Sequence, residues 1–276
     1  MNDIFDAARE SDGWIRATQT SGFLASKGTR HAVACAMVLS DETALENCMS
    51  RVLSPFEAVL AEAPSNAPRR RHELVAGRLA AKLALSQITS VPDPRTVSIL
   101  PGVLGQPVVS GANLANFGVS ISHSGFAAVA TAFPEACPVG LDIEEIRPEN
   151  TLALRKYATV EEFSRLREYL EGDETMPLTA LWCAKEAMSK LLRCGLSALP
   201  GTLNTHSPKR IGKLVEFQFS GFSGFRATVA CGRNRCLAVA LPPHVNGFND
   251  LGAWLFGQEA LLDARQPSLL LANAHR

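Results

Sequence analysis

Residues 139–144 place two carboxylates where a β-strand would bring them together. Side chains alternate between the two faces of a strand, so Asp142 and Glu144 share one face and Leu141 and Ile143 share the other. Two carboxylates so close repel each other unless a cation lies between them. Oxygen ligands on a short strand suit Mg²⁺, which completes its shell with water and phosphate oxygens. On this spacing alone, an edge strand with its polar face in water is the commoner explanation.

A second stretch, residues 182–192, has the period of an amphipathic helix. Glu186 and Lys190 are four residues apart and therefore lie on one face of that helix, one turn from each other. One interpretation is an exposed Glu–Lys pair that supports the helix. The other is a third metal carboxylate and a cation for a phosphate or a leaving group. The apolar stripe of the helix consists of Leu181, Ala184, Met188 and Leu191.

Composition limits the classes of protein that remain. The 276 residues are 46% hydrophobic, which is enough for one large domain or two small ones. A formal net charge of zero gives no general attraction to nucleic acid or to anionic lipid. No apolar run approaches a membrane span, and residues 1–16 lack the apolar segment of a secretory signal. Seven cysteines without a Cys-x-x-Cys pair predict reduced thiols, no zinc site and a cytoplasmic location.

The order strand, helices, strands occurs twice along the chain. It predicts an α+β fold of two similar lobes related by pseudo-twofold symmetry, each a small antiparallel sheet packed with helices. A site at the junction of the lobes is then expected. The predicted parts are an N-terminal extension over 1–30 that is partly disordered or loosely docked, lobes over 31–137 and 138–242, and a tail over 243–276, helical around 251–262.

The first lobe contains two features that bear on anion binding. A helix over 69–87 carries the basic residues Arg71, Arg78 and Lys82, which form an anion site only if they line a cleft. A strand over 119–124 delivers Ser122 and His123 to its end, before a hairpin turn at Gly125. The other elements expected in this lobe are a buried strand over 31–39, helices over 43–49 and from Ser54, and strands over 97–100 and 127–133.

In the second lobe, the long polar stretch 149–177 is predicted to be helical. The helix with Glu186 follows it and ends at Gly195. After a loop over 204–209, strands are expected over 215–219, 227–230 and 236–241.

Together these motifs resemble the Sfp-type 4′-phosphopantetheinyl transferase family. Residues 139–144 resemble its Gly-x-Asp-x-Glu strand, and residues 182–190 resemble its Trp-x-x-Lys-Glu-Ala-x-x-Lys helix. The resemblance extends over about residues 52–199, and motifs in matching order are more specific than any one alone. Three further segments match: 76–78 its Gly-Arg helix, 105–107 its Gly-Lys-Pro turn and 121–124 its Ser-His-Ser strand.

The resemblance implies a reaction, a fold and partners. Members of the family move the 4′-phosphopantetheine arm of coenzyme A to a serine of an apo acyl or peptidyl carrier protein and release adenosine 3′,5′-bisphosphate. Their two α+β lobes hold coenzyme A and Mg²⁺, for which Mn²⁺ can substitute. A cytoplasmic monomer is expected. The sequence does not select among carriers of fatty-acid, polyketide or nonribosomal peptide synthesis.

The resemblance also implies roles for individual residues. Asp142, Glu144 and Glu186 would hold the metal against the pyrophosphate. Lys190 would neutralise or protonate the departing phosphate, and either Glu186 or a metal-bound water would take the serine proton. Arg78 and Arg71 would serve the 3′-phosphate. The full set of expected coenzyme A contacts is Arg71, Arg78, Gln106, Ser122, His123, Lys185 and Lys190.

One position departs from the family pattern. Gln106 stands where the family's turn has Lys or Arg, so the turn can donate a hydrogen bond but contributes no charge. Weaker coenzyme A binding, or a substitute cation such as Lys82 or Arg70, is then expected.

The segment 149–177 is the expected docking surface for the carrier, because carriers are generally acidic around their serine. Its basic residues would meet that acidity, and Phe163 or Leu166 would supply an apolar contact. The basic residues are Arg155, Lys156, Arg165 and Arg167.

Two other functions are compatible with the motifs. One is a catalytically silent module that keeps the fold and binds carrier proteins. The other is a different Mg²⁺-dependent enzyme that acts on nucleotide phosphates. The intact carboxylates and Lys190 argue against a silent copy, which would be free to lose them.

Overall fold

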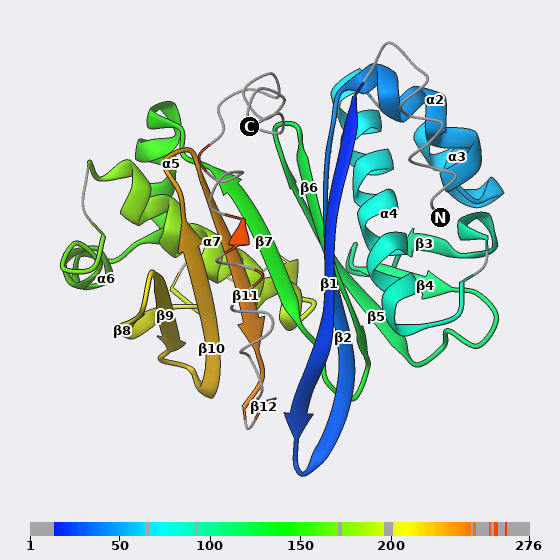
Figure 1. The fold of residues 1–276 in the computed structure, drawn as a ribbon. Coiled ribbons are helices and arrows are strands. Elements are labelled where there is room, and N and C mark those ends of the chain that lie inside the picture. Colours follow the sequence, from blue (N-terminus) through cyan, green and yellow to red (C-terminus); the bar gives the residue numbers. More distant parts are fainter. Residues whose placement is uncertain are drawn as a thin grey trace. The chain divides into compact units, whose positions relative to one another are not determined.

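The computed structural model describes residues 14–63, 67–91, 93–170, 173–195, 201–243, 245–246, 254, 257–258 and 263 (Figure 1). It divides into two compact units. Unit 1 contains the described residues up to Leu24 and Thr29–Pro138, and unit 2 contains Ala25–Gly28 and the described residues from Val139 onward. Each unit has an antiparallel sheet and one long helix against it, which confirms the predicted α+β class. The pseudo-twofold relation between the lobes stays a prediction.

The sheet of unit 1 has the strand order β1-β2-β6-β5. The apolar run 33–39 of β2 is buried throughout, as predicted. Residues 15–26, predicted as part of a loosely docked extension, instead form β1 next to β2. Hydrophobic periodicity missed this strand because only Leu24 is fully buried, so β1 depends mainly on backbone pairing. The bounds are β1 Ile15–Ser26, β2 Thr29–Ser40, β5 Phe117–Ser124 and β6 Ala127–Pro134.

Side-chain caps mark the starts of the first two helices of unit 1. Asp41 caps α2 by accepting a hydrogen bond from Ala44 N at 2.7 Å, and Ser54 forms a capping box at the start of α3. The long helix α4 lies across the sheet, where a Cβ on Gly77 would be 2.9 Å from Ile121 Cγ2, so glycine permits the close approach. The elements are α2 Glu42–Val52, α3 Pro55–Ala61, α4 Pro68–Ile88, η1 Pro94–Thr96, β3 Ser98–Pro101 and β4 Pro107–Ser110.

The sheet of unit 2 has the order β7-β11-β10-β9-β8, with every neighbouring pair antiparallel. Residues 205–209 of the predicted loop 204–209 are instead part of β8. Pro208 and a register shift between His206 and Lys209 mark it as an irregular edge strand. The short β12 pairs with Ala25 and Ser26. The bounds are β7 Gly140–Glu145, β8 Thr205–Ile211, β9 Leu214–Phe219, β10 Phe222–Cys231, β11 Arg235–Leu241 and β12 Val245–Asn246.

In the stretch 149–177, predicted to be helical, the described residues form short helices and the first turn of a long one. The long helix α7 then begins at Thr175 and packs on β7, β10 and β11. Its predicted apolar stripe is confirmed, because Leu181, Ala184, Met188 and Leu191 are all buried. The helices are η2 Pro148–Asn150, α5 Thr151–Leu154, η3 Arg155–Tyr157, α6 Val160–Leu166 and α7 Thr175–Leu191.

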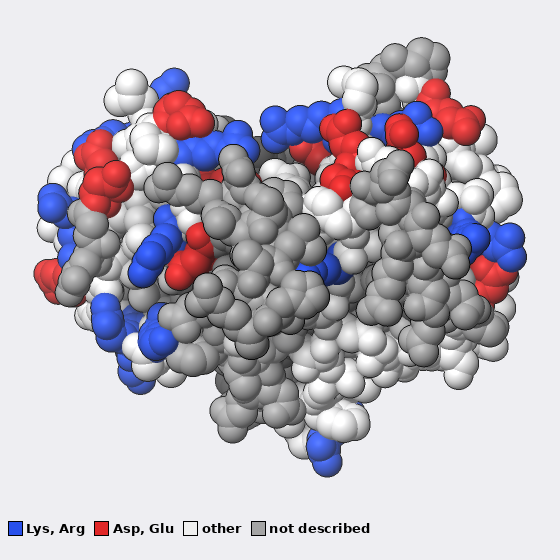
Figure 2. All heavy atoms as spheres, turned by 45° about the horizontal axis from the view of Figure 1, so that its top comes forward, with Lys and Arg blue, Asp and Glu red and all other residues white. Residues whose placement is uncertain are grey.

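The cysteines and the surface charges can be compared with what the composition predicted. All seven cysteines are free thiols. On the face drawn in Figure 2, acidic and basic side chains lie interspersed. No helix in the described ranges is long and apolar enough to cross a membrane. Residues 1–13 and most of the predicted tail helix around 251–262 lie outside the described residues.

Candidate functional site

Helix α7 lies directly against the carboxylate-bearing face of β7. A Cβ on Gly140, which shares that face, would be 1.9 Å from Ala187 O, so no residue with a side chain fits there. As a result Asp142 is only 1% exposed, although β7 is an edge strand. The explanation of an edge strand with its polar face in water is therefore wrong for Asp142.

Asp142 is held by α7 through both its side chain and its main chain. Lys190 Nζ lies 2.5 Å from Asp142 Oδ1, and the Cys183 thiol donates to Asp142 O at 3.3 Å. The Lys190 side chain stays 25% exposed, whereas that of Asp142 is 2% exposed. The lysine therefore reaches from solvent to a buried carboxylate.

Glu144 is fixed by an indole. Trp182 Nε1 donates to Glu144 Oε1 at 3.0 Å, and the Trp182 ring packs on Tyr157 with centroids 4.5 Å apart. Burial, and then the negative charge of Asp142, raise the pKa of Glu144 to about 7 against the opposing effects of Trp182 and Lys190.

Glu186 on α7 completes the acidic group. Burial and then the charge of Asp142 raise its pKa to about 7, and Lys190 opposes the rise. Asp142 thus interacts with both glutamates. The structure brings together Asp142, Glu144, Glu186 and Lys190, and the three carboxylates carry more negative charge than one lysine offsets.

The chemistry of this donor set suits a hard divalent cation, which prefers oxygen ligands. The geometry is not that of a finished metal centre. In the described part of the chain, no three His, Cys, Asp or Glu side chains are grouped closely enough to hold a metal ion. The pKa values of both glutamates are raised first by burial and then by the negative charge of Asp142, and a bound cation would offset that charge. The residues therefore fit a metal in the chemistry of their oxygen donors.

The raised pKa of Glu186 predicts a pH dependence of stability. Its pKa is about 7 in the folded protein and 4.5 ordinarily, so the folded state binds more protons between these values. The stability that this group contributes is therefore present at low pH and lost as the pH rises from about 4.5 to about 7. We expect Glu186→Gln to gain stability relative to the unaltered protein across this window, measured by urea unfolding with a chelator present. Parallel stability curves would contradict the burial of this carboxyl.

Lys185, predicted to contact a phosphate, is already engaged. Its Nζ donates to Tyr157 O at 2.6 Å and lies 2.8 Å from Glu162 Oε1. The side chain is 8% exposed, and burial lowers its pKa. A phosphate contact by Lys185 stays a prediction, and the described contacts favour a structural role.

The other predicted coenzyme A residues lie in unit 1. Ser122 is buried near the end of β5, and His123 Nδ1 lies 3.7 Å from Glu73 Oε1 on α4. Arg78 on the same helix donates from Nη2 to Ile99 O at 3.1 Å. The strand end therefore delivers the serine and histidine as predicted, while part of Arg78 supports β3.

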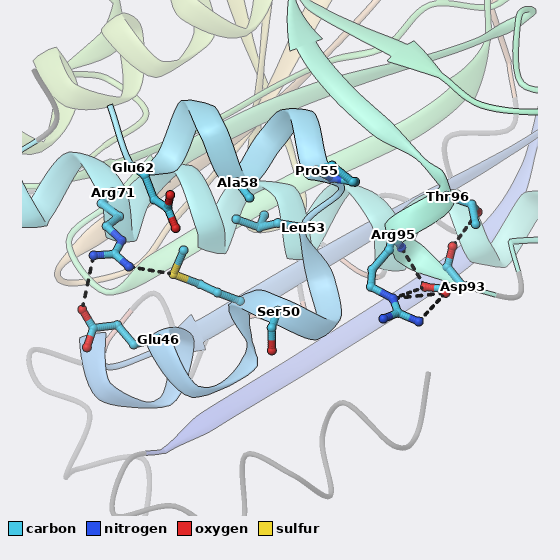
Figure 3. A pocket seen from close by; sticks show the side chains of 11 residues that line it. Glu46, Ser50, Leu53, Pro55, Ala58, Glu62, Arg71, Asp93, Arg95 and Thr96 are labelled. Carbon is cyan, nitrogen blue, oxygen red and sulfur yellow. Dashed lines mark hydrogen bonds and ion pairs between the residues drawn. The ribbon is translucent and has the colours of Figure 1, made fainter. Parts of the chain in front are cut away.

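Arg71 lines a cavity of about 640 Å³ between α2, α3, α4 and η1. Its Nη2 donates to Met49 Sδ at 3.4 Å, and its Nη1 lies 4.0 Å from Glu46 Oε1. Figure 3 shows Arg71 at one end of the cavity and the Arg95–Asp93 pair at the other. The guanidinium is thus held by α2, and a role toward the 3′-phosphate stays a prediction.

Gln106 closes its own turn. Its Oε1 accepts from Leu104 N at 2.9 Å, and its main-chain oxygen accepts from Gly102 N at 2.7 Å. Lys82 cannot substitute for a cation here, because it is fully buried with Nζ 2.5 Å from Glu57 Oε2. That part of the substitute-cation hypothesis is wrong.

Sequence reasoning missed three residues that hold other polar side chains in place. Trp182 was noted only as part of a motif, yet it holds Glu144. Glu162 and Glu57, the partners of Lys185 and Lys82, received no role. A signal existed for both glutamates, because each is the last residue of a Ser/Thr-x-x-Glu capping box.

Residues 138–235 match the family model of the 4′-phosphopantetheinyl transferase superfamily. The matched segment contains β7 and α7 with the three carboxylates and Lys190. The family predicted from the motifs is therefore confirmed for this segment.

Two similar proteins each match about a third of this chain. The 4′-phosphopantetheinyl transferase psf-1 of Bacillus pumilus is 32% identical over 93 residues, which are 34% of this chain. The match spans only 38% of the length of that relative. The holo-ACP-synthase from Plasmodium yoelii, a solved structure, is 23% identical over 32% of this chain and 77% of its own, with a TM-score of 0.28. A score this low does not establish a common fold.

Proposed function

We propose that this protein transfers the 4′-phosphopantetheine arm of coenzyme A to a serine of an apo acyl or peptidyl carrier protein, releasing adenosine 3′,5′-bisphosphate. The observation that supports this most is the grouping of Asp142, Glu144, Glu186 and Lys190 on β7 and α7. The group lies inside the segment that matches the transferase family. We further propose a cytoplasmic monomer.

In this proposal Asp142, Glu144 and Glu186 hold Mg²⁺ or Mn²⁺. When bound, the ion supplies positive charge to the pyrophosphate oxygens, which is the main requirement of phosphoryl transfer. Trp182 orients Glu144 for this role through its hydrogen bond. Lys190, one quarter exposed, extends its ammonium to the departing phosphate and neutralises or protonates it.

The serine of the carrier must lose a proton as it attacks. Glu186 is a candidate for this task, because its carboxylate belongs to the proposed metal site, where the serine must attack. A metal-bound water is the alternative base. In unit 1, Arg71, Arg78, Gln106, Ser122 and His123 are proposed to contact coenzyme A.

The test is direct. The protein is incubated with coenzyme A, Mg²⁺ and an apo carrier, and the intact mass of the carrier is followed. We expect the mass to increase by one phosphopantetheine arm, and a carrier whose acceptor serine is alanine should stay unchanged. Binding of the carrier without a mass change would favour the silent module. Conversion of coenzyme A without carrier labelling would favour a different nucleotide-phosphate enzyme.

The predicted docking segment, residues 149–177, exposes basic and apolar side chains on its short helices. Arg165 and Arg167 on and after α6 are exposed, and the Arg167 guanidinium lies 5.9 Å from the Phe163 ring centroid. Leu166 is 1% exposed, so the hypothesis that it contacts the carrier is wrong. Val160 is 87% exposed and offers apolar surface in its place.

Charge reversal in this segment should act on the carrier and not on coenzyme A. We expect R165E/R167E to raise the Michaelis constant for an acidic carrier about tenfold at low salt, because charge complementarity acts on encounter. Added salt should shrink the effect. The matched control is K209E/K213E on the β8–β9 hairpin, which changes the net charge equally. A rise in the coenzyme A constant instead would place this segment on the nucleotide side.

A further inference from the structure

Lys185 belongs to a buried group of polar contacts that ties three elements of unit 2 together. It donates from α7 to Tyr157 O and to Glu162, which is the third residue of α6 and completes its capping box with Thr159. The other carboxylate oxygen of Glu162 accepts from Thr205 N, the first residue of β8, at 2.6 Å. One glutamate and one lysine thus join a long helix, a short helix and the strand that follows.

Unit 1 contains the same group at different residues. Lys82 on α4 donates to Val52 O at 2.7 Å and to Glu57, the third residue of α3, which completes its capping box with Ser54. The second oxygen of Glu57 accepts from Ile99 N, near the start of β3, at 2.8 Å. In both units the accepting carbonyl belongs to the residue two before the helix cap.

The repetition indicates what the group does. Lys82 and Glu57 are fully buried, and neither is one of the proposed metal ligands. The residue after Lys82 is the buried Leu83, whereas the residue after Lys185 is Glu186. The same contacts therefore fix a long helix in both units, and only in unit 2 does the next residue carry a carboxylate of the candidate site.

A second series of contacts connects Tyr157 with Glu144, the other glutamate of the candidate site. The residue whose carbonyl accepts from Lys185 is Tyr157, and its ring packs on Trp182. Trp182 in turn donates to Glu144. Both glutamates of the site thus depend on residues anchored at Tyr157.

We propose that Lys185 and Glu162 form a positioning pair that sets the orientation of Glu186 and Glu144 for the metal, and that Lys185 does not contact substrate. This inference rests on the proposed function. Lys185 fixes the long helix of unit 2 as Lys82 fixes that of unit 1. In unit 2 the same contacts also orient the carboxylates of the candidate site.

The experiment separates positioning from phosphate binding. The variants are K185M, E162Q and E162Q/K185M, in the full chain. K185M leaves a buried carboxylate unpaired, and the double variant removes that charge too, so the test stays readable if K185M does not fold. K82M with E57Q/K82M is the matched control in unit 1. The measurements are the thermal unfolding midpoint, the Mn²⁺ dissociation constant by titration, and the two Michaelis constants.

We expect K185M to lower the unfolding midpoint and to weaken Mn²⁺ binding about tenfold, the lower end of the loss found when a group that orients a metal ligand is removed. E162Q/K185M should recover the unfolding midpoint, because no unpaired buried charge is left. It should still bind Mn²⁺ as weakly as K185M, because the contacts of Lys185 that hold α7 stay lost. E57Q/K82M and any folded K82M should leave the Mn²⁺ constant unchanged. At saturating Mn²⁺, the coenzyme A constant should stay the same in K185M and E162Q/K185M.

Two results would overturn the proposal. A double variant that is stable but has a strongly raised coenzyme A constant would make Lys185 a phosphate contact. Unchanged Mn²⁺ affinity in folded K185M or in E162Q/K185M would make the pair purely structural. If the unaltered protein binds no Mn²⁺, the proposed function fails first, and the positioning role fails with it.

Discussion

Asp142→Asn should abolish transfer while the protein stays folded. Asparagine fills the same buried volume, so the contacts of β7 with α7 survive. The charge that pairs with Lys190 and would bind the metal is lost. If it supplies about 4 kcal/mol of transition-state stabilisation, a scale typical of metal sites, the rate falls roughly a thousandfold. Turnover with coenzyme A and carrier measures the loss, and the thermal midpoint reports the fold.

A second readout of D142N does not depend on turnover. Asp142 raises the pKa values of Glu144 and Glu186, so its neutralisation should lower both below about 7. Titration followed by carboxyl NMR can detect the change. Glu149→Gln, at an exposed position soon after β7, is the control for charge loss alone. Near-normal turnover in folded D142N would remove Asp142 from the metal site.

Lys190→Met should also lower the rate of transfer, but for a different reason. Removing a group that stabilises developing negative charge typically costs about 10²–10³ in turnover. Lys190 also lowers the pKa values of both glutamates, so in K190M these should rise above about 7 and the acid limb of the pH–rate profile should move to higher pH.

Metal affinity distinguishes the two variants. K190M removes a competing cation from Asp142, so Mn²⁺ should bind at least as tightly as in the unaltered protein, whereas D142N should weaken it. K190R keeps the charge and should recover part of the rate. Weakened Mn²⁺ binding in K190M would indicate that Lys190 organises the carboxylates rather than serving the leaving group.

Local sequence patterns were enough to predict which side chains of the site share a face of a strand or a helix. A strand period of two put Asp142 and Glu144 on one face, and a helical period put Glu186 beside Lys190. The apolar stripe of α7 and the cap at Ser54 located their helices correctly. These features depend only on neighbours along the chain, which is why they could be predicted.

Strands without a strong pattern could not be predicted in this way. β1 and β8 carry mostly polar or half-exposed residues, and their strand conformation comes from backbone pairing with β2 and β9. No local signal marks such pairing, because the partner strand supplies the hydrogen bonds.

The tertiary structure alone decided which charges are exposed. Lys82 was placed on a basic helix face and Lys185 among the coenzyme A contacts, yet their partners lie 25 and 23 residues away and bury them. Asp142 lies on an edge strand, yet α7 covers it because Gly140 lets the helix backbone approach. Burial in turn raises the pKa values of Glu144 and Glu186. The sequence thus determined which residues are present and how they alternate, while their ionisation depends on solvent exclusion by distant segments, which no local pattern encodes.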